Sequence, residues 1–324
     1  MERDICFDIM KGIGILAVIA GHSIKQVTCD DILTWKFIYS FHLPMFFLIA
    51  GYFYKENSNI LNKIKADFKR LIIPYITTSF MFLIYQFLTN ESFYSSYKYI
   101  LIAILWGTGG SHTSAIWPNM PHIGAIWFLL SLFWCRTLFN LIVIKLKKPY
   151  WVVVIVAILA TITDRYIINL PFGLLPGLSA MTFYLIGHCF HYVKFKQYVI
   201  TISALSWIIH MLFSQIDMCS CYYKCYPIDI LGTTFGAIII YIISNKIASL
   251  SYSSYLTRLG KVSLVVLCFH TLEKNIIDYN FIPVIENNWI ILFIFRTTIC
   301  ISLTSIWYLF INLIKQLSST IYKI

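Results

Sequence analysis

Charged residues are scarce in this sequence. Only 12% of its 324 residues are Asp, Glu, Lys or Arg, about half the share that soluble domains carry. Hydrophobic residues make up 59% of the chain and the mean hydropathy is +0.76, and no segment is polar enough for a separate soluble domain. Composition therefore excludes a soluble globular protein and predicts one integral membrane domain over residues 1–324.

Apolar runs recur along the whole chain, at lengths that suit membrane-spanning helices of about 20 residues. The sequence predicts an all-α helix bundle with about ten transmembrane helices and both termini in the cytoplasm. The expected spans are 12–28, 36–54, 71–88, 122–143, 150–164, 176–193, 197–213, 229–245, 262–277 and 289–314. Segment 97–107 is short for a crossing, so we expect a re-entrant or interfacial helix there, within an external loop. The first apolar segment lacks a small-x-small cleavage site and is expected to remain as an anchor.

The net charge of +11 is unevenly distributed. In the ten-span topology most basic residues fall in cytoplasmic loops, which is the pattern that orients helices in a bilayer. The positive charge therefore reflects topology, and we expect a lipid bilayer, that of the cytoplasmic (plasma) membrane, as partner and no nucleic acid.

Two histidines stand inside the first two apolar stretches. His22 lies in GIGILAVIAGHSI and His42 in FIYSFHLPMFFLIAGYFY. An ionisable side chain at that depth is costly, and it usually faces a cavity where it does chemistry or moves a solute. Lys11 precedes His22 by eleven residues, which places it about 16 Å away on nearly the same helical face. A cation at the cytoplasmic mouth and a base at depth suit an anionic ligand with a reactive end.

Two more ionisable side chains are expected at a similar depth. Arg136 and His270 each lie nine residues from a cytoplasmic lysine, or about 14 Å of helix. Helices packed around one cavity would bring both together with His22 and His42. The alternative is that each side chain pairs separately with a backbone carbonyl or a tyrosine hydroxyl.

A basic stretch, NKIKADFKRLIIPYI, precedes the third expected span and carries Lys69 and Arg70. Such a stretch either anchors to anionic lipid or clamps a phosphate group, and composition does not separate the two. Among the nine cysteines, three cluster in CSCYYKC (219–225). This loop suits one disulfide in an oxidising compartment, and it lacks a fourth ligand at zinc spacing, so we expect no metal.

Five motifs in order resemble those of the acyltransferase family 3 membrane proteins. They are DIMKGIGILAVIAGH, FIYSFHLPMFFLIAGYFYK, FKRLIIPY, AIWFLLSLF and LGKVSLVVLCFH, which together run from Asp8 to His270. The chain is most similar to the group described as fucose 4-O-acetylase and related acetyltransferases. The resemblance implies an enzyme that moves an acetyl or short acyl group from cytoplasmic acyl-CoA, usually acetyl-CoA, to a hydroxyl of a carbohydrate or cell-surface glycan precursor.

The resemblance also implies roles for the donor-side residues. A basic residue, ten intervening residues and a catalytic histidine correspond here to Lys11 and His22. His22 would act as general base, or alternatively as a nucleophile that forms an acyl-histidine. Two arginines separated by two residues are expected before the third helix. Arg70 fits the second, whereas Asp67 stands at the first, and either Lys69 or Lys65 is expected to substitute for it.

Further roles are expected inside the cavity. His42 is the first choice for the donor that stabilises the oxyanion, and Trp127, His270 and Arg136 are expected to contact substrate. No carboxylate partner of His22 is assigned, because Asp8 is the only acid near the first span. The other candidate oxyanion donors are Ser40, Trp127 and Tyr52.

Two other classes of function compete with the enzyme. A transporter or flippase for a carbohydrate or acidic solute would also place histidines in the membrane, but no inverted repeat is visible and few Gly or Pro interrupt the spans. A haem or quinone protein would use His22, His42, His188 and His191. We rank it lower because no histidine pairs stand at usable spacing on facing spans.

Overall fold

The computed structural model describes residues 4–27, 32–89, 93–110, 112–113, 118–147, 149–190, 197–279 and 288–321. The described chain is helical apart from two short antiparallel hairpins, β1 (His112–Thr113) with β2 (Pro118–Met120) and β3 (Ile216–Asp217) with β4 (Tyr222–Tyr223). The helices are α1 (Ile5–Gln26), α2 (Ile32–Tyr39), α3 (His42–Tyr52), α4 (Ile60–Asp67), the π-helical turn η1 (Phe68–Ile72), α5 (Ile73–Thr89), α6 (Phe93–Trp106), α7 (Trp127–Lys145), α8 (Tyr150–Tyr166), α9 (Leu174–Ser179), α10 (Met181–Phe190), α11 (Gln197–Phe213), the 3₁₀ turn η2 (Met218–Ser220), α12 (Tyr226–Ala248), α13 (Ser253–Ile276) and α15 (Trp289–Ile321).

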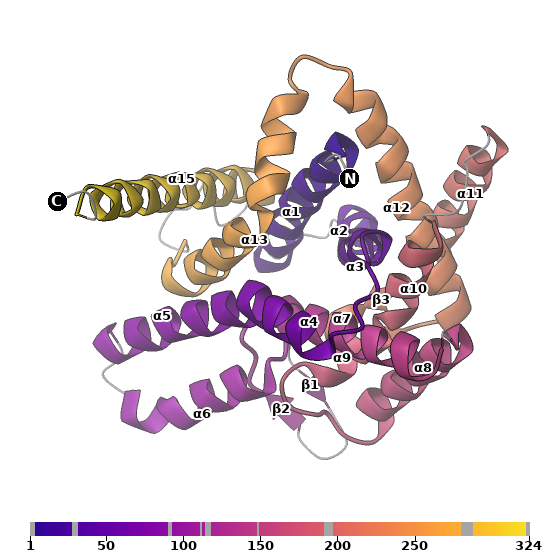
Figure 1. The fold of residues 1–324 in the computed structure, drawn as a ribbon, viewed down its shortest axis with the longest axis horizontal. Helices are drawn as coiled ribbons and strands as arrows, with labels where there is room; N and C mark the ends of the chain where they lie inside the picture. The colour runs from indigo at the N-terminus through magenta and orange to yellow at the C-terminus, as the bar shows by residue number, and fades with distance from the viewer. Residues whose placement is uncertain are drawn as a thin grey trace.

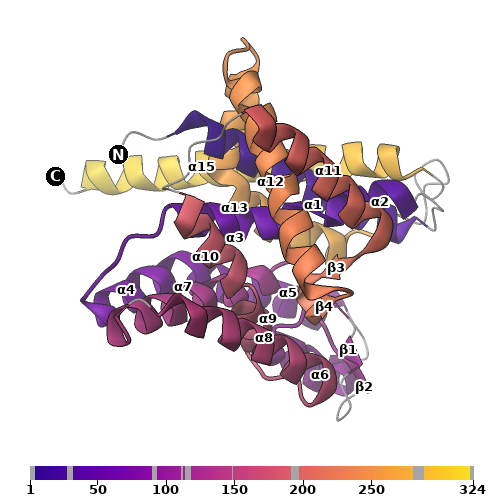
Figure 2. The same ribbon diagram turned by 90° about the vertical axis from the view of Figure 1, so that its right-hand side faces the viewer.

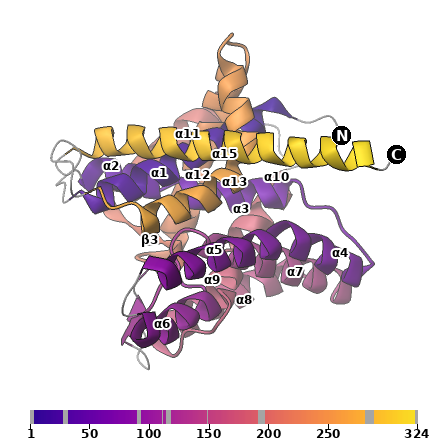
Figure 3. The same cartoon turned by 90° about the vertical axis from the view of Figure 1, so that its left-hand side faces the viewer.

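The helices form two groups. Figures 2 and 3 show α1, α11, α12, α13 and α15 on one side and α4 to α9 on the other. Helices α3 and α10 pack against each other between the two groups. The start of α1 and the end of α15 lie at the same end of the bundle, an arrangement that an even number of crossings requires.

Six helical segments in the described chain are long and apolar enough to cross a membrane. They are Ile5–Lys25, Leu33–Tyr52, Ile60–Thr89, Trp127–Lys145, Tyr226–Ala248 and Trp289–Gln316. The protein is therefore an integral membrane protein with an all-α fold. The count of ten crossings and the cytoplasmic termini stay predictions.

Helices overlap all ten expected spans, although several helices differ from the expected bounds. The first helix begins at Ile5 rather than residue 12, because Asp4 caps it by accepting a hydrogen bond from the Cys6 amide. Span 36–54 is divided into α2 and α3, and span 176–193 into α9 and α10. The division between α2 and α3 falls next to Pro44, which has no N–H to donate to the Ser40 carbonyl.

The short segment expected at 97–107 is part of α6, which is helical from Phe93 to Trp106. Helix α6 lies beside α5 (Figures 1 and 3), and the Tyr75 hydroxyl of α5 donates a hydrogen bond to the Ile104 carbonyl at 2.6 Å. This contact joins the start of α5 to the end of α6, so the two helices run antiparallel. Whether α6 crosses the bilayer stays a prediction.

Helices α1 and α13 pack in parallel through glycines. A Cβ atom at Gly260 would overlap the Asp8 carbonyl, and one at Gly12 would overlap the Leu256 carbonyl. Further along the same pair, the His22 ring lies next to the ring of His270, and Figure 1 shows the two helices side by side. Small residues allow this close backbone approach in membrane proteins, and here the approach sets the distance between the two histidines.

Replacing Gly260 with alanine should separate α1 from α13 and lower the thermal midpoint in detergent. Overpacking of this kind costs about 1–3 kcal/mol. Gly110→Ala is the matched control, since its Cβ would meet only the flexible Cys219 side chain, at 3.3 Å. Equal thermal midpoints for Gly260→Ala and the unaltered protein would contradict the packing argument.

Candidate active site

A cavity of about 500 Å³, here called the first cavity, follows α1 along almost its whole length. The α1 residues that line it are Asp4, Phe7, Asp8, Lys11, Ile15, Val18, His22 and Lys25. Steps of three and four residues put these side chains on one helical face. The other walls come from α2, α3, η1, α7, β3, η2 and α13, and from the loops that hold Lys55 and Gly109.

The Lys11 end of the first cavity is rich in cations. The basic side chains that line it there are Lys11, Lys55, Arg70 and Arg136. Lys11 pairs with Asp8 at 2.6 Å. Asp8 lies fourteen residues before His22, about 21 Å along the helix, so it neutralises part of the Lys11 charge and is too far away to assist His22.

Asp67 holds Arg136 in place. The Nε and Nη2 atoms of Arg136 each lie 2.8 Å from Asp67 Oδ1, and Lys63 Nζ lies 3.0 Å from Asp67 Oδ2. Arginine has five N–H donors, so Arg136 keeps donors for a ligand in the cavity. Arg136 lines the same cavity as His22 and His42, among the cations at the Lys11 end, and its expected contact with substrate stays a prediction.

The π-helical turn η1 orients the basic stretch. Pro74 has no N–H to donate to the Arg70 carbonyl, and the Ile73 amide instead reaches back to the Phe68 carbonyl. Lys69 and Arg70 are both exposed, but only Arg70 lines the first cavity. Such turns often occur at functional sites in helices.

A second cavity, of about 780 Å³, meets the first at His22. It is lined by His22, Lys25, Tyr85, Gln86, Thr89, Gly109, His122, Lys274, Asn275, Ile276, Ile277 and Asp278. His22, Lys25 and Gly109 line both cavities. A ligand in either cavity can therefore contact the His22 side chain.

The His22 ring packs against a buried chain of polar residues. The centroids of the His22 and His270 rings are 5.3 Å apart. His270 Nδ1 lies 3.2 Å from Glu273 Oε2, and Arg296 Nε lies 3.2 Å from Glu273 Oε1, with all three side chains fully buried. His270 Nε2 and His22 Nδ1 are buried without a hydrogen-bond partner in the described chain. The expectation that His270 belongs near His22 thus agrees with the geometry, although His270 itself lines neither cavity.

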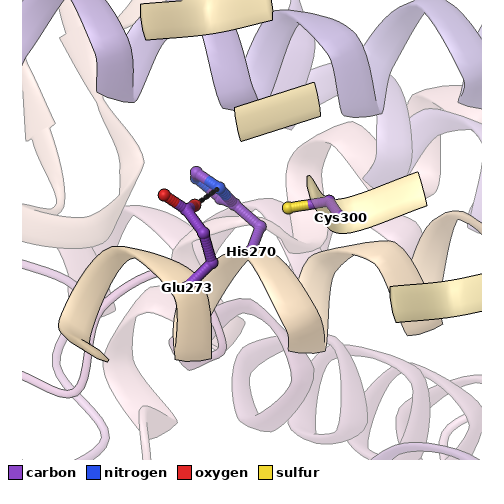
Figure 4. Close-up of side chains that lie close together, drawn as sticks. All are labelled: His270, Glu273 and Cys300. Carbon is purple, nitrogen blue, oxygen red and sulfur yellow. Dashed lines mark hydrogen bonds and ion pairs between the residues drawn. The ribbon is translucent and has the colours of Figure 1, made fainter. Parts of the chain in front are cut away.

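Glu273 is a buried carboxylate near the paired histidines that the sequence did not single out. It is three residues from His270 on α13, and the motif HTLE places both side chains on one helical face. Figure 4 shows Glu273 and His270 turned toward each other. The i,i+3 spacing of His270 and Glu273 is the sequence pattern that could have identified this pair. The contact with Arg296 of α15 has no such pattern and depends on how the helices pack.

Glu273 and His270 also form a cluster with Cys300 that has metal-ligand chemistry. The ligand atoms of the three lie within 4.8 Å of one another, with Cys300 reaching across from α15 in Figure 4. The Arg296 guanidinium already occupies one Glu273 oxygen, and a cation bound there would have to displace it. The absence of a metal stays a prediction.

His42 lines the first cavity with a defined tautomer. Its Nδ1 lies 2.7 Å from the Ile38 carbonyl, which also accepts a hydrogen bond from the Phe41 amide at 3.4 Å, in the break between α2 and α3. A neutral ring must therefore carry its proton on Nδ1 and a lone pair on Nε2. Neutral His42 then presents an acceptor to the cavity, which does not suit the oxyanion donor role expected for it.

The alternative oxyanion donors differ in availability. Ser40 Oγ donates to the Phe37 carbonyl and accepts from Trp207 Nε1 at 2.7 Å, so its hydroxyl is engaged. The Tyr52 ring packs on Phe7, with centroids 4.5 Å apart. Trp127 lines the first cavity, and its indole N–H is a donor only.

The histidines expected for a haem or quinone site do not gather at His22. His188 Nε2 lies 3.3 Å from the Tyr150 hydroxyl, and the ring packs on Tyr54 and Phe139. His188 lines neither cavity. His191 lies outside the described residues.

A family model described as an acyltransferase domain, of the acyltransferase 3 type, matches residues 4–309. The matched region contains every residue that lines the two cavities. The match carries no evidence for the fucose 4-O-acetylase group within the family. Neither a curated protein nor a solved structure matches the chain.

Proposed function

The chain belongs to the acyltransferase 3 family, and from that premise we propose that it moves an acetyl or short acyl group from cytoplasmic acyl-CoA to a hydroxyl of a carbohydrate or cell-surface glycan precursor. Family membership implies O-acyl transfer. The observation that carries the specific proposal is the place of His22, which lines both a cavity with a cationic end and a separate polar cavity. The plasma membrane is the proposed location.

The first cavity suits the acyl donor. Coenzyme A carries phosphates, for which arginine offers a planar fork of donors and lysine a point charge. Lys11, Arg70 and Arg136 line one end, and about 16 Å of helix separates Lys11 from His22. The phosphates would bind at that end, while the thin pantetheine arm extends along the α1 face and brings the thioester to His22.

The second cavity suits the acceptor. Its hydroxyl would give its proton to a His22 ring nitrogen while its oxygen attacks the thioester carbonyl. The new C–O ester bond forms, the C–S bond breaks, and the proton passes from His22 to the departing thiolate of coenzyme A. His270 and Glu273 would hold the His22 ring and stabilise its transient positive charge, through the chain of contacts at 5.3 and 3.2 Å. In the alternative route a His22 ring nitrogen bonds to the acyl carbon as the C–S bond breaks and the thiolate leaves, and the acceptor oxygen then forms the C–O ester bond as that C–N bond breaks.

The negative charge on the thioester oxygen needs a hydrogen-bond donor during the attack. Trp127 is the proposed donor, because the indole lines the first cavity close to Gly109, a residue of both cavities. His42 is proposed to orient the thioester by packing its ring, on the Nε2 edge, against the acyl donor.

The test uses the purified full-length protein in lipid nanodiscs with acetyl-CoA, with free coenzyme A thiol as readout. We expect thiol release without a sugar, with water as acceptor, and faster release when a sugar acceptor is present. Solute counterflow in proteoliposomes without any thiol release would instead favour the transporter.

Arg70→Gln should raise the KM for acetyl-CoA about tenfold or more, because one charge-assisted contact to phosphate contributes about 1.5–3 kcal/mol. The KM for the acceptor should change little. Lys69→Gln is the matched control, since Lys69 is adjacent but exposed outside the cavity lining. Equal increases for both variants, or for both substrates, would mean that the basic stretch only anchors the protein to lipid.

A further inference from the structure

Two lysines extend beyond the paired histidines at the second cavity. Lys25 follows His22 by three residues on α1, and Lys274 follows His270 by four residues on α13. Because α1 and α13 run in parallel with the two rings in contact, both lysines lie about one helical turn, or 5.4 Å, further along the helices. Both side chains line the second cavity.

Neither lysine has a hydrogen bond or an ion pair within the described chain. Lys274 is nevertheless half-buried, and removal of an ammonium group from water is costly. Asp278 is the one carboxylate among the residues that line this cavity in the described chain, so the balance of charge there is positive.

The remaining lining is suited to a sugar. Hydroxyl and amide groups come from Tyr85, Gln86, Thr89 and Asn275, and such groups bond to sugar hydroxyls in either direction. The cavity thus offers neutral polar contacts together with two cations that follow His22 and His270 along their helices. A neutral sugar would use only the neutral contacts, whereas an anionic sugar would also neutralise the excess positive charge of the two lysines over Asp278.

Given the proposed acyl transfer, we infer that the acceptor is an acidic sugar, whose carboxylate or phosphate binds between Lys25 and Lys274 while a hydroxyl a few ångströms away reaches His22. A uronic acid ring carries its carboxylate and its ring hydroxyls at about the spacing of one helical turn. The bond changes are those of the proposed reaction: the sugar C–O ester forms, the thioester C–S breaks, and the proton leaves with the thiol.

The test compares three acceptors with radiolabelled acetyl-CoA and the full-length protein in nanodiscs. They are an oligogalacturonate, the same oligosaccharide after reduction of its carboxylates to alcohols, and galactose 6-phosphate. We expect kcat/KM for the oligogalacturonate to exceed that for its reduced form by tenfold or more. The rate with galactose 6-phosphate shows whether the anionic group of the acceptor must be a carboxylate.

Lys25→Gln and Lys274→Gln should each reduce the preference for the acidic over the reduced oligosaccharide by about tenfold. Lys274→Arg, which keeps the positive charge, should retain much of this preference. This ratio is measured within one preparation, so partial loss of folded protein does not alter it. Lys98→Gln is the control, because Lys98 is an exposed lysine of α6 outside both cavities. It should keep the preference of the unaltered protein.

Three outcomes would overturn the acidic-sugar assignment while leaving acyl transfer intact: equal use of the acidic and reduced oligosaccharides, an unchanged preference in both lysine variants, or thiol release with transfer to no acidic acceptor. The absence of thiol release under every condition would overturn the acyltransferase proposal itself, and the acceptor assignment with it.

Discussion

His22→Ala is expected to abolish acyl transfer and water-dependent thioester hydrolysis together. His22 is the histidine that lines both cavities in the described chain, so its loss removes the group that takes the hydroxyl proton. General base catalysis contributes about 10²–10⁴-fold, and loss of a nucleophile would cost at least as much. The readout is thiol release from acetyl-CoA at saturating donor concentration.

The same variant should insert and fold normally. His22 has an unpartnered ring nitrogen, so alanine breaks no hydrogen bond at that atom. His188→Gln is the control: it changes a histidine that packs near Tyr150, outside both cavities, and should retain the transfer rate. Substantial thiol release by folded His22→Ala would reject His22 as the reacting residue, whichever of the base and acyl-histidine routes operates.

The sequence predicted most of the helices because membrane-spanning helices are recognisable by the length and hydropathy of their apolar segments. It also placed Lys11 and His22 on one face, since eleven residues are close to three helical turns. The helix breaks were harder to predict. Pro44 follows His42 by two residues, and only the structure shows that the Ile38 carbonyl, beside this helix break, fixes the ring tautomer.

The partners of the ionisable residues were predicted less well, because they depend on which helices meet. From the sequence, Asp67 is a departure from the expected pair of arginines. In the structure Asp67 accepts a hydrogen bond from Arg136, a residue of α7 that is sixty-nine positions away in the sequence. Arg296 reaches Glu273 from α15. Such contacts join distant segments and leave no local pattern, whereas the pair of His270 and Glu273 follows helical spacing and was recognisable.

Glu273→Gln should lower kcat about 10²-fold or more while changing the KM for acetyl-CoA little. Glu273 does not line either cavity, so we treat it as a positioning residue that acts through His270. Glutamine keeps the shape but lacks the charge that stabilises a positive imidazole beside His22. The measurement is the separation of kcat from KM in the thiol-release assay.

The difficulty is that Glu273 also neutralises Arg296, whose side chain is fully buried. Leaving a buried charge without its partner costs about 3–5 kcal/mol, so the single variant combines a structural and a chemical loss. The double variant Glu273→Gln/Arg296→Gln separates them, because it removes the unpaired guanidinium. We expect the double variant to regain thermal stability and to remain slow. Recovery of both stability and kcat would show that Glu273 serves only to neutralise Arg296, and His22 would then act without a carboxylate behind it.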